Sequence, residues 1–271
     1  MSFSSFEIQC TSFLSLQAMS SVSVEIVTTI KNLQKLDSLS SFSLGGGTNL
    51  ALRYNHRESL DIDLFTDKII GRIGFDSIQS EIESFFGKDI SSFSFPCNIN
   101  DQFIFARCFI NCNDKVIKVE LLQNMKRLHE IEVKDKIRLV SKKDIGLFKL
   151  ISAANRAAKK DVYDLDYITE EIPLIDLYKE LKIKVKKHSS DSDKTIFDLD
   201  EERCPISNPN LLLSFDKQNN KNQFRPSHSD DSIQKFEGKT WNSARYSWRK
   251  KVRELFTYLD IPFPKSPPID L

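Results

Sequence analysis

The sequence predicts an α+β fold in which a mixed sheet with flanking helices is followed by a mainly helical half. Short segments of alternating apolar and polar residues, typical of half-buried strands, lie in the first half, and helical periodicity flanks them. Longer helical patterns dominate after residue 139. With 271 residues, 40% of them hydrophobic, the chain can bury one large or two ordinary cores. We expect two domains, residues 1–138 with the sheet and residues 139–271 mainly helical.

The individual elements follow from two periodicities. Expected helices, in which apolar residues recur at intervals of three or four, span residues 24–39, 75–86, 141–168 and 241–259. Expected strands, with an interval of two, span residues 42–44, 60–65, 103–111 and 115–123. Ser141 and Asp144 form a capping signature at the start of the third helical region, and residues 184–232 are polar and resemble loop.

Composition excludes several classes of protein. The 39 basic and 38 acidic residues nearly cancel, so the overall charge commits the chain to neither nucleic acid nor membrane. Five cysteines, without any C-x-x-C pair, predict reduced thiols rather than a disulfide framework. The first residues lack the basic region of a signal peptide, and no apolar run approaches the ~18 residues of a membrane span. We expect a cytoplasmic protein with no membrane partner.

Three consecutive glycines precede two aspartates in the stretch GGGTNLALRYNHRESLDIDLF, residues 45–65. Glycine tolerates positive φ and close approach to a ligand, so a strand, a glycine turn and a helix make a plausible phosphate cradle. The stretch is neither a Walker loop, since no Gly-Lys-Ser/Thr follows, nor a dinucleotide fingerprint. A simple strand-to-helix turn remains the alternative.

Asp61 and Asp63 lie on a strand pattern and should project to the same side, about 7 Å apart. Two carboxylates at that distance repel each other unless a cation lies between them. Oxygen ligands of this kind suit Mg²⁺, which takes one or two protein carboxylates together with water and substrate phosphate. The alternative is a pair of solvated residues on an edge strand.

These motifs resemble the signature of the AbiEii-type nucleotidyltransferases, the toxin components of abortive-infection and toxin–antitoxin pairs within the DNA polymerase β-like superfamily. The first block matches at Gly46, Gly47, Thr48, His56, Arg57, Ser59, Asp61 and Asp63. A second block, KDIGLFKLISAANRAAKKDVYDLDYI, matches at Lys149, Arg156, Lys160, Asp161, Asp164 and Leu165. The resemblance covers residues of roughly 40 to 170 and implies a nucleotidyltransferase-type sheet, with a helical domain that completes the cleft.

The resemblance also implies phosphoryl transfer from a bound NTP with Mg²⁺ or Mn²⁺. Metal ligands and catalytic residues would be Asp61, Asp63 and Glu120, where Glu120 supplies the third carboxylate from a later strand. Substrate-binding residues would be Gly46, Gly47, Thr48, Lys149, Arg156, Asp161 and Asp164, with the Lys149 charge on the β- and γ-phosphates.

Other roles remain open for several of these residues. Lys149, Arg156 and Lys160 share one stripe if the helix is continuous, and that stripe either lines a cleft or is a solvated basic face. Glu120 could instead pair with Lys118, two residues earlier on the strand. Asp161 and Asp164 could pair with neighbouring lysines or support the adjoining domain. His56 could be a general base, although a residue that orders the loop is favoured.

The acceptor implied by the resemblance is RNA, with a tRNA 3′ end as the leading candidate, and a cognate antitoxin is a further expected partner. Residues 239–256 interleave basic and aromatic side chains, which suits RNA, although the aromatics also follow the spacing of a packing helix. Two alternative functions remain: transfer of AMP to a protein hydroxyl, and a catalytically idle interaction protein.

Overall fold

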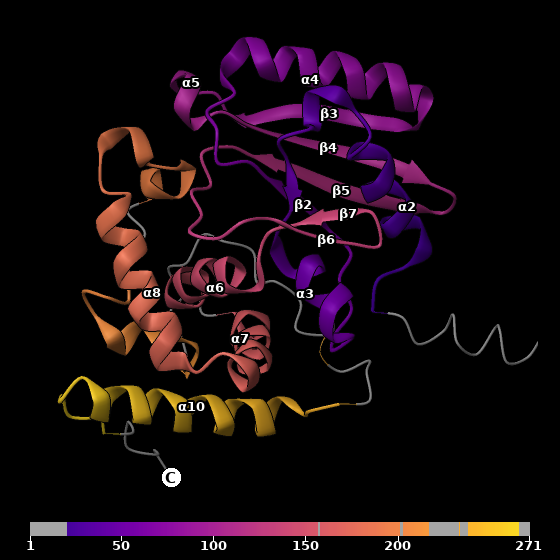
Figure 1. Cartoon of the computed structure of the whole chain (residues 1–271). Coiled ribbons are helices and arrows are strands. Elements are labelled where there is room, and N and C mark those ends of the chain that lie inside the picture. The colour runs from indigo at the N-terminus through magenta and orange to yellow at the C-terminus, as the bar shows by residue number, and fades with distance from the viewer. Residues whose placement is uncertain (1–20, 157, 201–202, 217–232, 234–237, 266–271) are drawn as a thin grey trace, which may run out of the picture.

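A mixed seven-stranded sheet forms one end of the molecule and a group of helices forms the other (Figure 1). The computed structural model describes residues 21–156, 158–200, 203–216, 233 and 238–265. The strand order is β3-β4-β5-β2-β1-β7-β6. The strands are β1 (Ser43–Leu44), β2 (Ile62–Phe65), β3 (Ile90–Cys97), β4 (Phe105–Cys112), β5 (Lys115–Leu122), β6 (Glu132–Lys134) and β7 (Ile137–Leu139). Strand β2 runs parallel to β5, and β1 runs parallel to β7, whereas the other neighbours are antiparallel.

Helices surround the sheet and then form the second half. The α-helices are α2 (Val24–Leu33), α3 (Gly46–Tyr54), α4 (Gly71–Phe86), α5 (Asn100–Phe103), α6 (Lys142–Arg156), α7 (Lys159–Glu171), α8 (Leu174–Lys187) and α10 (Trp241–Tyr258). Short 3₁₀ helices are η1 (Asp37–Leu39), η2 (Gly87–Asp89), η3 (Asp191–Asp193), η4 (Ile196–Asp200) and η5 (Pro209–Asp216). None of the described helices is both long enough and apolar enough to cross a membrane. The α+β class expected from the sequence is confirmed.

The described residues contain two large hydrophobic cores and a small cluster of Tyr163, Ile233 and Ala244. The first is built from the sheet, α2 and α4, and its buried members lie between Val22 and Leu139. The second is built mainly from residues 140–256, with Leu50 of α3 as a contribution from the first half. Trp248 of α10 is fully buried there, and its indole nitrogen donates a hydrogen bond to the Leu212 carbonyl at 2.9 Å.

The local signals in the sequence explain most element boundaries. Helix α6 begins after Ser141, whose hydroxyl accepts a hydrogen bond from the Asp144 amide at 3.0 Å, so the predicted cap is confirmed. The helix expected over residues 24–39 ends at Leu33, and η1 follows after a turn. The mostly helical region expected over residues 141–168 consists of two helices, because α6 ends at Arg156 and α7 begins at Lys159.

Three strands were absent from the sequence prediction. Strand β3 is an edge strand with mostly serine and phenylalanine side chains, half of them exposed, so it carried no strong apolar signal. Strands β6 and β7 are three residues each, and Asp135 and Lys136 between them adopt positive φ values of 51° and 65°. A turn of this kind commonly contains glycine or asparagine. Because neither residue is present at these two positions, the sequence carried no signal for the hairpin.

The polar stretch 184–232 is only partly loop. Its first residues complete α8, and η3, η4 and η5 follow, while residues 217–232 lie outside the described part of the chain. The cysteines within the described residues are free thiols, as expected, and Cys10 lies outside them.

Candidate active site

The carboxylates singled out in the sequence meet at the centre of the sheet. Strands β2 and β5 are parallel neighbours, and their register places Asp63 directly beside Glu120. Asp61 immediately precedes β2, and all three side chains line one cavity of about 800 Å³. The structure therefore brings together two carboxylates that are separated by one residue and a third, Glu120, that lies 57 positions after Asp63.

Asp63 carries negative charge that its surroundings do not fully compensate. Burial, together with the negative charges of Glu120 and Asp61, raises the pKa of Asp63 to about 6, against the weaker opposing effects of Lys118 and Arg156. A carboxylate in this position lowers its free energy when a cation approaches. The chemistry of Asp61 and Asp63 thus fits Mg²⁺, which binds to one or two carboxylates and completes its shell with water and phosphate oxygens.

Glu120 is less available than the two aspartates. Arg107, its cross-strand neighbour on β4, contacts it at 2.6 Å, and Lys118 contacts it at 3.2 Å. Burial disfavours ionisation, but Lys118 and Arg107 outweigh it and lower the pKa of Glu120. Lys118 also lies 3.3 Å from Asp61. Glu120 therefore lines the cavity and also pairs with Lys118. Among the described residues, no group of three or more acidic, histidine or cysteine side chains is arranged to hold a metal ion.

The glycines make room for charged side chains. Gly46 has a φ of 58°, and a Cβ atom there would collide with the Asp63 carboxylate. A Cβ atom on Gly47 would collide with the Arg57 guanidinium. The Gly45 amide donates a hydrogen bond to the Asp63 carbonyl at 2.7 Å, which fixes the loop against β2. Only glycine allows the loop to approach these groups so closely.

Thr48 does not face the cavity. Its side chain is buried, its hydroxyl lies 2.7 Å from the Ser59 hydroxyl, and it also donates to the Asp61 carbonyl. The Thr48 side chain therefore positions the segment that leads into β2. The expected contact between the Thr48 backbone and phosphate stays a prediction. Gly46 and Gly47 do line the cavity.

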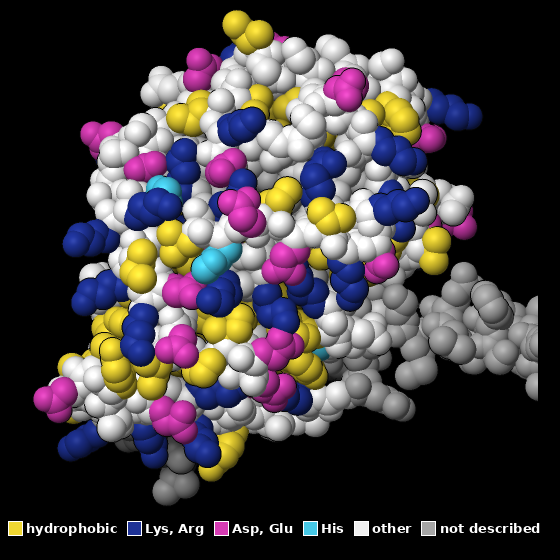
Figure 2. Space-filling view, viewed as in Figure 1, with side chains coloured by type: hydrophobic (Ala, Val, Ile, Leu, Met, Phe, Trp, Pro, Cys, Tyr) yellow, Lys and Arg dark blue, Asp and Glu magenta, His cyan; other side chains and the backbone are white. Residues whose placement is uncertain are grey.

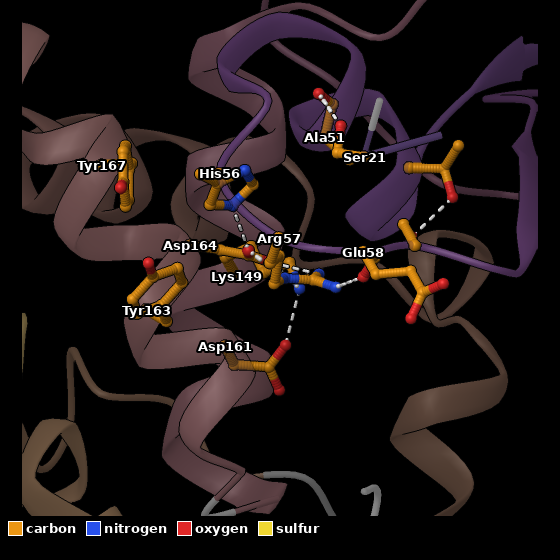
Figure 3. Close-up of polar contacts among 12 residues, drawn as sticks. Ser21, Ala51, His56, Arg57, Glu58, Lys149, Asp161, Tyr163, Asp164 and Tyr167 are labelled. Carbon is orange, nitrogen blue, oxygen red and sulfur yellow. Dashed lines mark hydrogen bonds and ion pairs between the residues drawn. The ribbon is translucent and has the colours of Figure 1, made fainter. Parts of the chain in front are cut away.

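A buried charge cluster connects the two halves of the chain behind the cavity (Figure 3). Its members are His56, Arg57, Lys149, Asp161 and Asp164. Asp164 of α7 accepts two hydrogen bonds from Arg57, at 2.6 and 2.8 Å, and lies 2.7 Å from both His56 Nε2 and Lys149 Nζ. Although burial opposes ionisation, Arg57 and Lys149 hold the pKa of Asp164 well below 3.8.

Three residues of the second block, Lys149, Asp161 and Asp164, belong to this cluster. Asp164 is fully buried and outside the cavity lining, so the structure does not support direct substrate binding by its carboxylate. Lys149 lines the cavity but is only 8% exposed, with its ammonium paired to Asp161 at 2.6 Å and to Asp164. Burial disfavours the Lys149 ammonium, but the two carboxylates outweigh it and raise the pKa of Lys149. Asp161 lines the cavity beside it.

His56 is a structural residue in this arrangement. Burial lowers its pKa despite the neighbouring Asp164, and its ring stacks on Tyr163 with a centroid distance of 5.7 Å. Its 2% exposure leaves no path to a substrate hydroxyl, which favours the loop-ordering role over the general base.

Arg156 and Lys160 both line the cavity, although a break between α6 and α7 separates them. Burial, and then the positive charges of Lys149 and Arg57, lower the pKa of Lys160. Both side chains therefore add positive charge to the cavity lining, as the sequence pattern suggested, but they lie on two helices rather than on one.

Sequence reasoning missed Arg107 and left Arg57 without a role. The alternation of β4 and β5 could have placed Arg107 opposite Glu120, but the register across their turn was needed first. Arg57 finds its partner 107 residues later, a pairing that no local pattern encodes.

The raised pKa of Asp63 predicts a pH-dependent stability. The folded state binds more protons than the unfolded state between pH 3.8 and about 6, so the stabilisation from a protonated Asp63 is lost as pH rises through that window. Asp63→Asn should raise the free energy of unfolding of the metal-free protein at pH 8 by about 1 to 2 kcal/mol, less than the full shift implies because the cavity is open to water. The gain should disappear near pH 3.5.

Urea denaturation of both proteins at the two pH values measures this difference. Asp114→Asn, in the exposed β4–β5 turn, is the matched control and should show no such gain. Lower stability of Asp63→Asn at pH 8 would contradict the electrostatic description of the site.

Comparisons with known proteins found a matching family and similar proteins. A family model described as "Nucleotidyl transferase AbiEii toxin, Type IV TA system" matches residues 31–237. An uncharacterised protein of Aquifex aeolicus (strain VF5) is 32% identical over 169 residues, which are 60% of this chain and 75% of the relative. The solved nucleotidyltransferase toxin MenT4 from Mycobacterium tuberculosis H37Rv aligns with 86% of this chain and 82% of its own, at 17% identity and a TM-score of 0.46.

Proposed function

This chain belongs to the AbiEii nucleotidyl transferase toxin family of type IV toxin–antitoxin systems, and we propose that it transfers a nucleoside monophosphate from an NTP to RNA, with a tRNA 3′ end as acceptor. The observation that carries the proposal is that Asp63 and Glu120, on adjoining parallel strands, and Asp61, just before β2, line a cavity large enough for a nucleotide. In this proposal, residues 1–138 form the nucleotidyltransferase domain and residues 139–271 form the helical domain that completes the cleft. The family implies a cognate antitoxin, and we propose a cytoplasmic location.

Asp61 and Asp63 would hold Mg²⁺ or Mn²⁺, which when bound supplies positive charge to the triphosphate and the developing negative charge. Glu120, held as a carboxylate by Arg107 and Lys118, accepts the proton of the attacking acceptor hydroxyl. The hydroxyl oxygen forms the new bond to the α-phosphorus, and pyrophosphate leaves as the old phosphoanhydride bond breaks.

Positive charge for the phosphates comes from basic side chains that line the cavity. Arg156 and Lys160 line it, and we assign them the direct phosphate contact that the sequence pattern placed on Lys149. Lys149 and Asp161 would support these phosphate contacts indirectly, because their ion pair joins α6 to α7 at the cavity. Gly46 and Gly47 let the loop backbone approach the phosphates while Asp63 and Arg57 occupy the space beside them.

Fewer side chains of α10 are available to bind RNA than its sequence suggests. Trp248 is core and Trp241 is half-buried, whereas Tyr246 is widely exposed. Lys239 and Lys251 are paired with the buried Asp166 at 2.6 Å. The helix also lies at the end of the molecule away from the sheet (Figure 1). Acidic and basic side chains are interspersed on the face in Figure 2, which gathers no patch of one sign.

The acceptor is tested by incubating the protein with total RNA or total protein, Mg²⁺ and each labelled NTP in turn. Label in RNA supports the proposal, and label in a terminal nucleotide of tRNA supports its acceptor. Label in protein would contradict transfer to RNA and indicate transfer to a protein hydroxyl. No label in either pool would favour a catalytically idle interaction protein.

A charge reversal separates RNA binding from nucleotide binding. If α10 contacts RNA phosphates, Arg249→Glu combined with Lys250→Glu should reduce RNA transfer about tenfold and weaken its dependence on salt, because fewer counterions are released. Affinity for NTP should not change. The same reversal at Lys31 and Lys35, on and just after α2, is the control; equal losses from both pairs, or none from the α10 pair, would remove α10 from the RNA site.

A further inference from the structure

The cavity has an apolar wall that the chemistry proposed above does not use. This apolar wall consists of the lining residues Pro96, Ile99, Phe105, Phe148, Phe197 and Leu199. Ile99 is 55% exposed and Leu199 is 42% exposed, unusually high values for large apolar side chains inside a concavity. Apolar surface of this kind, left to water within a pocket, marks the place where a ligand's own apolar surface binds.

The wall is assembled from both halves of the chain. The segment after α8, which carries η3 and η4, returns to the sheet domain and lies beside α5 (Figure 1). Gln102 of α5 donates to the carbonyls of Asp191 and Lys194, at 2.7 and 2.8 Å. Asn124, after β5, donates to the carbonyls of Ser192 and Lys194, at 2.9 and 2.8 Å. Two amides thus hold this segment against the sheet domain.

The same segment fixes its own start. Asp198 accepts hydrogen bonds from the Thr195 amide and hydroxyl, at 2.6 and 2.9 Å, which closes the first turn of η4. Phe197 lies within that turn and is half-buried at the cavity. Hydrogen bonds before and within η4 thus fix the turn that carries Phe197.

We propose that this wall binds a nucleobase, with Phe197 as a stacking surface. The proposal rests on the function proposed above, since it assigns the part of the nucleotide that the carboxylates and basic residues leave unbound. Every base has an apolar π-face, so stacking on an aromatic ring tolerates any of the four bases. Apolar neighbours such as Leu199 exclude water around the ring and strengthen the contact.

The base belongs to the incoming NTP in this assignment, although the terminal nucleotide of the acceptor RNA offers the same chemistry. Tripolyphosphate separates the two parts of the NTP, because it carries the phosphates and no base. The probes are therefore tripolyphosphate and non-hydrolysable analogues of the four NTPs, each titrated calorimetrically with Mg²⁺ into the full chain.

Phe197→Ala should weaken the binding of all four NTP analogues about tenfold or more, by similar factors, and leave tripolyphosphate affinity unchanged. Phe85→Ala, at an exposed phenylalanine of α4, is the matched control and should change neither. Gln102→Ala should weaken NTP binding in the same direction, because it removes two of the hydrogen bonds that hold the segment.

Unchanged NTP binding by folded Phe197→Ala would overturn the proposal, and so would an equal loss of tripolyphosphate binding. A raised KM for acceptor RNA alone would assign the wall to the acceptor base and overturn the NTP assignment. Failure of the parent protein to bind NTP analogues or tripolyphosphate would instead refute the proposed function itself, so the two failures are distinguishable.

Discussion

Asp63→Asn is expected to reduce nucleotidyl transfer by about three orders of magnitude, which corresponds to about 4 kcal/mol in the activation barrier. The substitution keeps the shape of the side chain and removes the charge that faces the cavity beside Asp61 and Glu120. It should also relieve growth arrest in cells that express the protein. Labelled NTP incorporation into RNA, measured at saturating Mg²⁺, gives the rate.

The fold should survive this change, because the substitution removes one member of a repelling group. Asp76→Asn, at an exposed position on α4, makes the same chemical change away from the cavity and should leave the rate unaltered. Near-parental activity of Asp63→Asn would remove Asp63 from the catalytic machinery, whatever the stability of the variant.

Asp164→Ala is expected to destabilise the protein by about 3 to 5 kcal/mol, the usual consequence of leaving buried charges without their partner. Arg57 and Lys149 both contact this carboxylate, and His56 lies against it, so its removal leaves two buried cations with too little negative charge. Chemical denaturation measures the loss as a lower free energy of unfolding. Asp176→Ala, in an exposed ion pair with Lys179 on α8, should cost almost nothing.

The same carboxylate gives the stability a defined dependence on acid. The pKa of Asp164 is lowered in the folded state, so its contribution is present above the unfolded value of 3.8 and is lost as pH falls below it. The difference in stability between the parent and Asp164→Ala should therefore narrow toward pH 3. A difference that is constant from pH 7 to pH 3 would mean that packing, rather than charge, explains the loss.

The parts of the site that are local in sequence could be predicted, and the parts set by tertiary pairing could not. Asp61 and Asp63 needed only the two-residue period of a strand, and the glycines needed only their spacing from them. The role of Lys149 could not be predicted in this way, because its ammonium is oriented by ion pairs with the buried carboxylates of Asp161 and Asp164.

The fold shows the same division. The segments with strong apolar periodicity became elements close to their expected bounds, as α4 and β5 illustrate. The break between α6 and α7 has neither glycine nor proline within residues 155–160, so no local residue marks it. Helix propensity there is overruled by packing, since α6 and α7 contribute to the same core.

The ion pair between Arg57 and Asp164 joins residues 107 positions apart, which bears on how the protein is made. During synthesis, the glycine loop and both aspartates leave the ribosome well before α7 exists. Until Asp164 arrives, Arg57 has no carboxylate to hold it beside Gly47, so the loop lacks one of its supports. Contacts of such long range form late. A nascent or truncated chain that ends before α7 therefore carries the acidic residues without an assembled site, and the site can assemble only after α7 has been synthesised.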